Sequence, residues 1–276
     1  MVVDCGLSTP YLMHEMLAIA ALHISILNPG EEHFRRRQAT ELQQAALRQF
    51  DYSNFEVTEA SCVPMFLFSS FLGIHMLCDT LRYRDEDLNK FLDSFTHWLK
   101  LHRGVRSITN KSWHLLQRTE LAPFLKTGEA VAASVGQNGQ ECSRLRALIH
   151  SSELTTSSKE VYDEAIEHLQ SLFDSQGIMG PEDSVQTVFH WPIIVSAQYA
   201  VLLSQRRPEA LVLLAHYAML LHVHRWLWVI GDGGEFLIRS ISESLGSPWA
   251  SWLEFPLSAL EADQCKSLED VDMEKT

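Results

Sequence analysis

The chain has 276 residues, 46% of them hydrophobic, which is enough for a sizeable core and excludes a chain that is disordered throughout. Its 22 Lys and Arg against 35 Asp and Glu leave a formal net charge of −13. This acidic surplus disfavours direct contact with nucleic-acid phosphates by this chain.

The five cysteines are too scattered for a metal or disulfide framework. They are Cys5, Cys62, Cys78, Cys142 and Cys265. Their number is odd and no two form a Cys-x-x-Cys pair, so neither paired disulfides nor a cysteine zinc site is expected. This usage fits a reducing compartment, and we expect a cytoplasmic or nuclear location.

No targeting or membrane segment is predicted. The N-terminus lacks a basic region followed by an apolar run and a small-residue cleavage site. Long apolar runs occur, but His, Gln, Ser or Arg interrupts each of them, so none predicts a membrane span. Residues 261–276 are predominantly acidic and predict a solvated, disordered tail after a single domain at 1–260.

Apolar residues recur at helical spacing in the first half of the chain. Pro10 opens a helix that runs to Leu27 and is apolar on nearly all sides, which is typical of a buried helix. Further helices are expected over 31–50, through 64–81, and over 87–102, the last ended by Gly104.

The middle of the chain is less regular. The polar, glycine-bearing stretch 127–141 predicts a loop. A helix is expected over 160–173, followed by a break at 176–183. No alternation of apolar and polar residues between hairpin turns appears, so a sheet is not expected.

The stretch from His190 to Pro256 is the most apolar part of the second half. A helix over 184–204 is expected to bend or begin at Pro192, and a second long helix is expected over 208–228. Glycines then break the chain before a helix over 235–245. The whole chain therefore predicts an all-α fold, a single large helical bundle of roughly ten helices.

Catalytic signatures are sparse. The chain contains no Gly-x-Ser-x-Gly elbow, phosphate loop or dinucleotide-binding glycine pattern, so no cofactor is expected. His222 and His224 are two residues apart on a predicted helix and face different sides, so no metal site is expected there. Asp232 and Glu235 fit a helix start, where carboxylates are favoured. The alternative is an acid at a pocket rim that protonates a substrate or anchors a hydroxyl.

The last third of the chain carries a recognisable pattern of packing residues, ending in a Trp-x-x-Trp-Leu-x-x-Pro motif. In order it reads Pro208, Ala210, Leu211, Leu213, Leu214, Ala215, Tyr217, Ala218, Leu220, Leu221, His222, Trp226, Gly231, Leu237, Ile238, Ile241, Trp249, Trp252, Leu253, Pro256. Together with the opening run from Tyr11 to His23, it resembles the C-terminal regulatory domain of fungal zinc-cluster transcription factors, in particular the sterol-sensing regulators of sterol uptake and biosynthesis.

This resemblance implies an all-α domain with an apolar central pocket for a sterol or another hydrophobic small molecule, whose occupancy would control nuclear entry and activation. At helical spacing, aromatic and Met side chains are core by default, and the resemblance favours a pocket. The expected ligand-binding residues are Met65, Phe68, Phe189, Trp191, Tyr217, Trp226, Trp228, Gly231 and Asp232.

Two features depart from the family pattern. The six-cysteine DNA-binding cluster is absent from this sequence, so the chain is either a fragment or a relative that has lost DNA binding. Asp232 stands where the family turn usually has Trp, which leaves room for a different ligand or for chemistry.

Three functions stay open from the sequence. The first is a ligand-sensing regulatory domain without its own zinc cluster, as a monomer or a homodimer. The second is a stand-alone, metal-free enzyme of fungal secondary metabolism, of cyclase or isomerase type, using Asp232, Glu235 or His for acid–base chemistry. The third is an interaction module.

Overall fold

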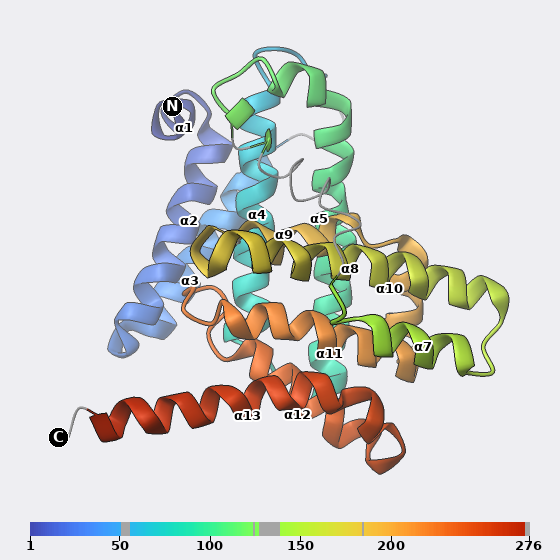
Figure 1. Ribbon diagram of the computed structural model, residues 1–276. Helices are drawn as coiled ribbons and strands as arrows, with labels where there is room; N and C mark the ends of the chain where they lie inside the picture. The colour runs from blue at the N-terminus through green and yellow to red at the C-terminus, as the bar shows by residue number, and fades with distance from the viewer. Residues whose placement is uncertain (51–55, 124, 127–138, 184, 274–276) are drawn as a thin grey trace. The chain divides into compact units, whose positions relative to one another are not determined.

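The computed structural model describes residues 1–50, 56–123, 125–126, 139–183 and 185–273, and these residues contain helices and turns but no strand. The predicted all-α class is therefore confirmed. The helices are α1 (Val2–Ser8), α2 (Pro10–Leu27), η1 (Pro29–Glu31), α3 (Glu32–Gln49), α4 (Cys62–Arg82), α5 (Leu88–Leu116), α7 (Ser143–Ser151), α8 (Thr156–Asp183), α9 (Val185–Ile194), α10 (Ala197–Ser204), α11 (Pro208–Val223), α12 (Gly233–Leu245), η2 (Ser247–Trp249) and α13 (Ala250–Met273) (Figure 1).

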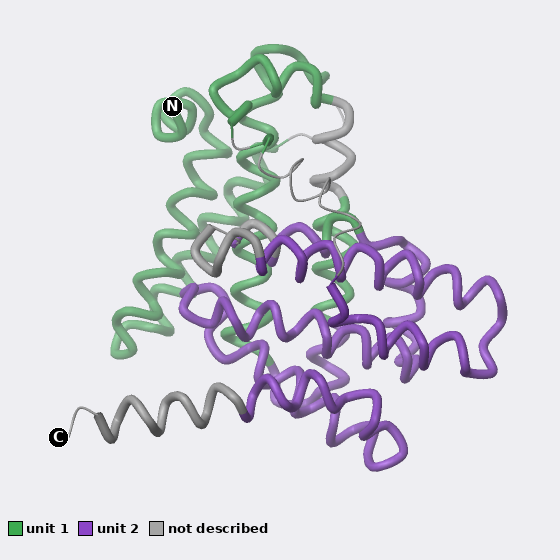
Figure 2. The backbone as a smooth tube through the Cα atoms, in the orientation of Figure 1, with its two compact units in different colours: residues 1–84, 94–130, 192–194 green, residues 85–93, 131–191, 195–276 purple. Residues whose placement is uncertain are grey.

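The chain forms two compact units, and each is assembled from separate stretches of sequence (Figure 2). Unit 1 comprises Met1–Arg84, Ser94–Ala130 and Pro192–Ile194. Unit 2 comprises Asp85–Asp93, Val131–Trp191 and Val195–Thr276. Helices α5 and α9 contribute residues to both units. The single domain at 1–260 stays a prediction.

Unit 1 is built on α2, which packs against α3 and α4. The rings of Tyr11, Phe50 and Phe68 cluster there, with centroids 4.7 to 5.2 Å apart. A Cβ atom added to Gly73 of α4 would overlap the His102 ring of α5. The absence of a side chain at residue 73 therefore lets α4 and α5 approach closely.

Helices α2 and α4 are each long and apolar enough to cross a membrane by length and composition. The same properties describe the core helices of a compact protein. In unit 1 these two helices pack on each other, and Glu15 of α2 is buried against His75 of α4. A pair of polar, titratable side chains of this kind fits a protein interior better than a lipid-facing surface.

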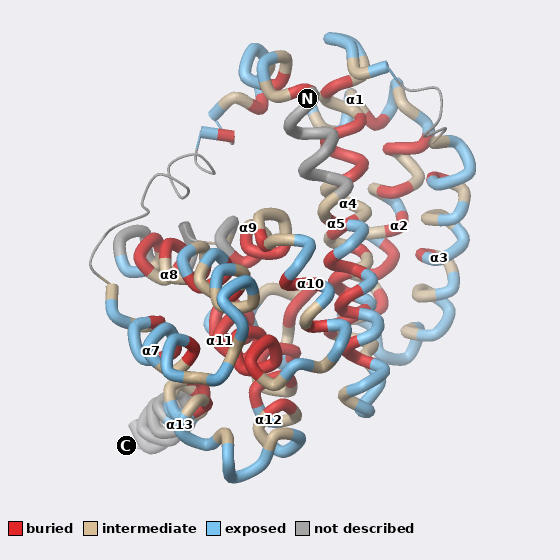
Figure 3. The backbone as a smooth tube through the Cα atoms, turned by 90° about the vertical axis from the view of Figure 1, so that its right-hand side faces the viewer, coloured by how far each residue is buried: buried red, intermediate tan, exposed pale blue. Residues whose placement is uncertain are grey.

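Unit 2 is organised around α11, whose residues from Glu209 to His222 are all buried. Helices α8, α10, α12 and α13 pack against it. Figure 3 shows the buried backbone along α11. The apolar sequence of α11 has no polar face because the helix is enclosed on all sides.

Several predicted helix boundaries are wrong. The break expected at Gly104 falls inside α5, and the break expected at 176–183 falls inside α8. A glycine within a helix costs about 1 kcal/mol, which in α5 is offset by the packing of buried residues before and after Gly104, such as Leu99 and Leu116. The long helix expected to reach residue 228 ends at Val223, and the chain continues in turns.

The region around Pro192 forms two helices, where the sequence predicts one helix that bends or begins at Pro192. Pro192 lies inside α9, which ends two residues later. Helix α10 begins afresh, with Ser196 as its N-cap residue accepting a hydrogen bond from the Tyr199 N–H at 3.3 Å. The sequence also did not predict helices α1, α7 and α13.

Two predicted segments lie at or beyond the limits of the described residues. The predicted loop at 127–141 lies mostly outside them. Helix α13 extends to Met273 and so covers most of residues 261–276. The disordered acidic tail expected there stays a prediction.

Cys5, Cys62, Cys78 and Cys142 are free thiols.

Candidate functional site

An aromatic cluster joins α9, α10 and α11 in unit 2. The Trp191 ring stacks on Tyr217, with centroids 4.6 Å apart and planes at 20°, and meets Tyr199 edge-on at 5.3 Å. All three side chains are completely buried. Burial raises the pKa of both tyrosine hydroxyls well above their ordinary value, so both stay protonated donors.

Each polar atom of this cluster is bonded to the backbone. The Trp191 Nε1–H donates to the Ala165 carbonyl at 3.2 Å, and the Tyr199 hydroxyl donates to the Ala210 carbonyl at 3.0 Å. The Tyr217 hydroxyl donates to the Val188 carbonyl at 2.7 Å. With their hydrogen-bonding capacity directed to neighbouring helices, Trp191 and Tyr217 pack as core residues.

The glycine turn before α12 is shaped by close helix packing. Gly231 has a φ of 52°, in the left-handed region that glycine adopts without strain. A Cβ added to Gly234 would overlap the backbone nitrogen of His222 and lie 2.7 Å from the Ala218 carbonyl oxygen. The first turn of α12 therefore rests directly on the backbone of α11, and a side chain at residue 234 would separate the two helices.

The two candidate acids lie at the start of α12, as the structural interpretation predicted. Asp232 is the exposed N-cap residue, and Glu235 is in the first turn. The Glu235 carboxylate accepts a hydrogen bond from Arg239 Nε at 2.8 Å, one turn later. Helix-start electrostatics and a local ion pair account for both residues.

The other predicted ligand-binding residues are divided between the two units. Trp226 is 56% exposed, whereas Trp228 and Phe189 are half-buried. Met65 and Phe68 belong to the core of unit 1. Within unit 2 the structure brings Trp191 and Tyr217 together, and the apolar central pocket stays a prediction.

Three histidines on α11 or at its C-cap are buried. His222 and His224 are buried, and Nδ1 of His224 lies 2.8 Å from the Leu220 carbonyl oxygen. His216 is also buried, and burial lowers its pKa to about 4. Among the residues that the structure describes, no three His, Cys, Asp or Glu side chains are grouped to hold a metal ion.

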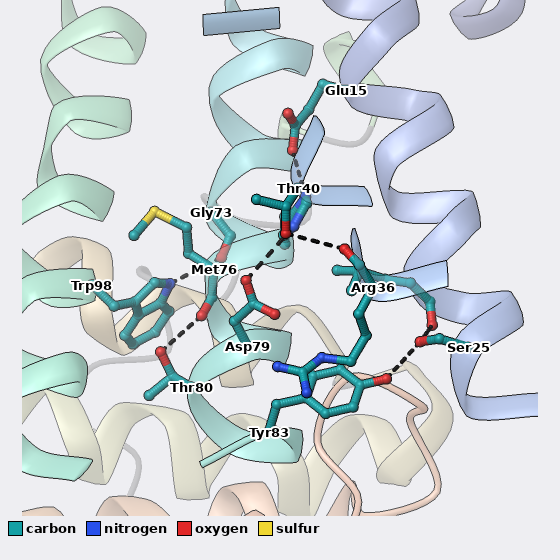
Figure 4. A network of polar contacts seen from close by, with 12 residues as sticks. Glu15, Ser25, Arg36, Thr40, Gly73, Met76, Asp79, Thr80, Tyr83 and Trp98 are labelled. Carbon is teal, nitrogen blue, oxygen red and sulfur yellow. Dashed lines mark hydrogen bonds and ion pairs between the residues drawn. The ribbon is translucent and has the colours of Figure 1, made fainter. Parts of the chain in front are cut away.

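Unit 1 contains a buried Glu–His pair that the sequence did not predict. Glu15 of α2 and His75 of α4 are both buried and lie 3.1 Å apart, and His75 Nε2 is 3.7 Å from the carboxylate of the exposed Asp79. Nearby, the Arg36 guanidinium lies 3.7 Å from the Tyr83 ring centroid (Figure 4). In the sequence, this pair is indicated only by a titratable residue within each of two apolar helical runs.

Unit 2 also has an open groove of about 470 Å³ between the start of α7 and α13. It is lined by Gln140, Glu141, Arg144, Glu254, Phe255 and Ser258. Arg144 and Glu254 form an ion pair across it at 2.5 Å. None of the predicted ligand-binding residues lines this groove.

A sequence match supports a distant relationship to fungal transcription factors. The chain is 24% identical over 210 residues to the Zn(2)-C6 fungal-type transcription factor afumD of Aspergillus fumigatus (strain CBS 144.89 / FGSC A1163 / CEA10). The matched region covers 75% of this chain, and it spans 55% of that relative's length. No family model matches the chain, and no solved structure matches it.

Proposed function

We propose that this chain is the regulatory part of a fungal transcription regulator. The observation that carries the proposal is the similarity to a Zn(2)-C6 fungal-type transcription factor across three quarters of the chain. The net charge of −13 supports a role away from the DNA phosphates, with DNA contact made by another part or a partner. This role places the protein in the nucleus, or in the cytoplasm before activation.

The regulatory part is proposed to respond to a sterol or another lipophilic small molecule. The resemblance of the C-terminal packing pattern to sterol-sensing regulators supports this class of ligand. Phe189, Trp226 and Trp228 are predicted contacts with apolar area left to bury, because Phe189 and Trp228 are half-buried and Trp226 is 56% exposed. Trp191 and Tyr217 would support the site by holding α9 against α11.

The enzyme alternative receives no specific support from the described geometry. Asp232 is exposed at a helix start, and the Glu235 carboxylate is engaged by Arg239. Neither residue is placed in an enclosed site where acid–base catalysis would be favoured. We therefore favour the regulatory function.

The regulatory role is tested by fusing the full chain to a heterologous DNA-binding domain in yeast and measuring a reporter gene. We expect the fusion to change transcription relative to the DNA-binding domain alone, and sterol depletion to change that level further. A fusion that expresses well but leaves the reporter unchanged in every condition contradicts the regulatory role.

Ligand binding is tested separately with the purified chain. Native mass spectrometry of protein expressed in yeast should detect a retained lipophilic molecule, and added ergosterol should raise the melting temperature. Trp228→Ala should weaken this shift, whereas Val201→Ala, at an exposed position outside the predicted contacts, should not. No retained molecule and no shift with sterols or other lipids would reject the ligand while leaving the reporter result intact.

A further inference from the structure

Helix α2 is apolar on nearly all sides, but the structure encloses only part of its surface. Its buried residues lie on the side that packs against α3 and α4, and they are Tyr11, Leu12, Glu15, Ala18, Ala21, Leu22 and Ser25. The opposite side carries a row of five residues, which we call the outer stripe: Met13, Leu17, Ala20, Ile24 and Leu27. Leu17 is 48% exposed and Leu27 is 64% exposed. Exposed apolar side chains grouped on one face of a helix mark an interaction surface.

The outer stripe has the spacing of a seam between paired helices. Its members follow one another at steps of four, three, four and three residues, a mean period of about 3.5 residues. At about 100° of rotation and about 1.5 Å of rise per residue, the stripe keeps to an arc of roughly 80° and is about 21 Å long. A surface helix normally turns charged residues toward water. The stripe therefore favours a second helix as its occupant.

Charge favours a second copy of this chain as the source of that helix. Of the 18 residues of α2, Glu15 is the single Asp, Glu, Lys or Arg, and it is buried. Residues 1–50 contain four Arg and five Asp or Glu, a local net charge of −1, so −12 of the chain's −13 lies in residues 51–276. Two copies of an acidic chain repel each other. The outer stripe offers them an approach with little repulsion.

A lipid surface fits the outer stripe less well. A helix that lies on an anionic membrane carries Lys and Arg beside its apolar face. Helix α2 contains neither residue type. In the neighbouring α3, three consecutive arginines each lie within ion-pair distance of a glutamate four residues away, in the pairs Arg35–Glu31, Arg36–Glu32 and Arg37–Glu41. The positive charge of these arginines is therefore compensated within α3 and the turn before it.

The order of side chains in the outer stripe is self-complementary. The small Ala20 is at its centre, with Leu17 and Ile24 on either side and Met13 and Leu27 at the ends. In an antiparallel pair of α2 helices centred on Ala20, Leu17 of each copy lies beside Ile24 of the other, and Met13 lies beside Leu27. A two-fold symmetric dimer needs such a surface, because both copies use the same patch. Alanine at the axis lets the two helices approach closely.

We propose that the outer stripe is the interface of a homodimer, in which the α2 helices of two copies pack antiparallel around Ala20. A single helix pair is smaller than the interface of an obligate dimer. Monomers and dimers should therefore exchange in an equilibrium that depends on protein concentration. Dimerisation by this contact is independent of the proposed ligand.

Sedimentation velocity of the full chain over a roughly hundredfold range of concentration tests the dimer. The weight-average mass should rise from one chain toward two. Leu17→Glu should raise the dimer dissociation constant about tenfold or more, because it places a carboxylate in an apolar contact. Leu101→Glu is the matched control, since Leu101 of α5 is 46% exposed and lies outside the stripe. A wild type that stays monomeric throughout, or equal dissociation constants for both variants, would overturn the proposal. Binding of a monomeric wild type to phosphatidylserine vesicles would assign the stripe to a lipid surface instead.

Charge variants of Ala20 test the position of the symmetry axis. Ala20→Glu and Ala20→Lys should each weaken self-association, because like charges of the two copies meet at the axis. An equimolar mixture should restore dimers, since each glutamate then faces a lysine. A mixture that associates no more than either variant alone would reject this pairing. Loss of monomer stability in Leu17→Glu, measured by circular dichroism, would show that the stripe is covered within one chain and would also reject the dimer.

Discussion

The Tyr217 hydroxyl donates a 2.7 Å hydrogen bond to the Val188 carbonyl of α9. This carbonyl lacks its usual helical donor because residue 192 is a proline. In an uninterrupted helix, the N–H of residue 192 would bond to the carbonyl of residue 188. Proline has no N–H, so that carbonyl is available to a neighbouring helix. The Tyr217 hydroxyl of α11 therefore replaces the hydrogen-bond donor that Pro192 removes from α9.

Replacing Tyr217 with Phe should destabilise unit 2 by about 1–3 kcal/mol, because a buried carbonyl would lose its donor. Urea unfolding followed by tryptophan fluorescence measures the change. In a Pro192→Ala background, the restored N–H can bond to Val188, so Tyr217→Phe should cost less. Equal costs in both backgrounds would show that the two residues do not share this carbonyl.

Replacing Gly234 with Ala should destabilise unit 2 by about 2 kcal/mol or more, because its Cβ would collide with the backbone of α11. Gly177→Ala is the matched control, since Gly177 lies in α8 and a Cβ added there would meet no atom within 4 Å. The control should stabilise the protein by about 0.5–1 kcal/mol through helix propensity. Melting temperatures that move in the same direction for both variants would contradict this account.

Lowering the pH should reduce the free energy of unfolding of unit 2 through the buried His216. Burial lowers the pKa of this histidine to about 4, whereas the unfolded chain takes up the proton near pH 6.5. Between these values the unfolded state binds more protons, so the free energy of unfolding falls with falling pH, by up to about 3 kcal/mol. Urea titrations at pH 7, 6 and 5 should show this slope, and His216→Gln should flatten it. An unchanged slope in the variant would exclude His216 as its source.

Removal of the α10 cap tests the break between α9 and α10. Ser196→Ala should cost about 1 kcal/mol, because its side chain accepts the Tyr199 N–H. Ser196→Asn should retain most of the stability, since asparagine is also a good N-cap. Chemical denaturation of the three proteins gives the comparison, and equal stability of Ala and Asn variants would argue against the cap.

The fold class followed from the sequence because apolar residues recur at helical spacing over long stretches, as in α4 and α11. The helix ends were harder to predict. Gly104 looked like a stop signal, but the cost of one glycine is smaller than the gain from continuing a packed helix. Pro192 indicated a disturbance without showing that a new helix would begin at Ala197.

The candidate site was less predictable, because its residues depend on contacts between distant segments. Asp232 and Glu235 could be placed at a helix start from local signals alone. Glu15 and His75 are 60 residues apart, and their pairing depends on how α2 packs on α4. In the sequence, each of these two residues is a polar residue within an apolar helix, and this pattern does not identify its partner. The pairing becomes visible only when the packing of the helices is known.

The interleaving of the two units also limits how the protein can be divided. A cut after residue 130 would leave the amino-terminal fragment without Pro192–Ile194 of its own unit and with the segment Asp85–Asp93 of the other. No single cleavage of the backbone yields both units intact on separate fragments. Fragment complementation should therefore succeed only when both fragments are present during refolding. A mutation that slows the folding of one unit should also slow the folding of the other.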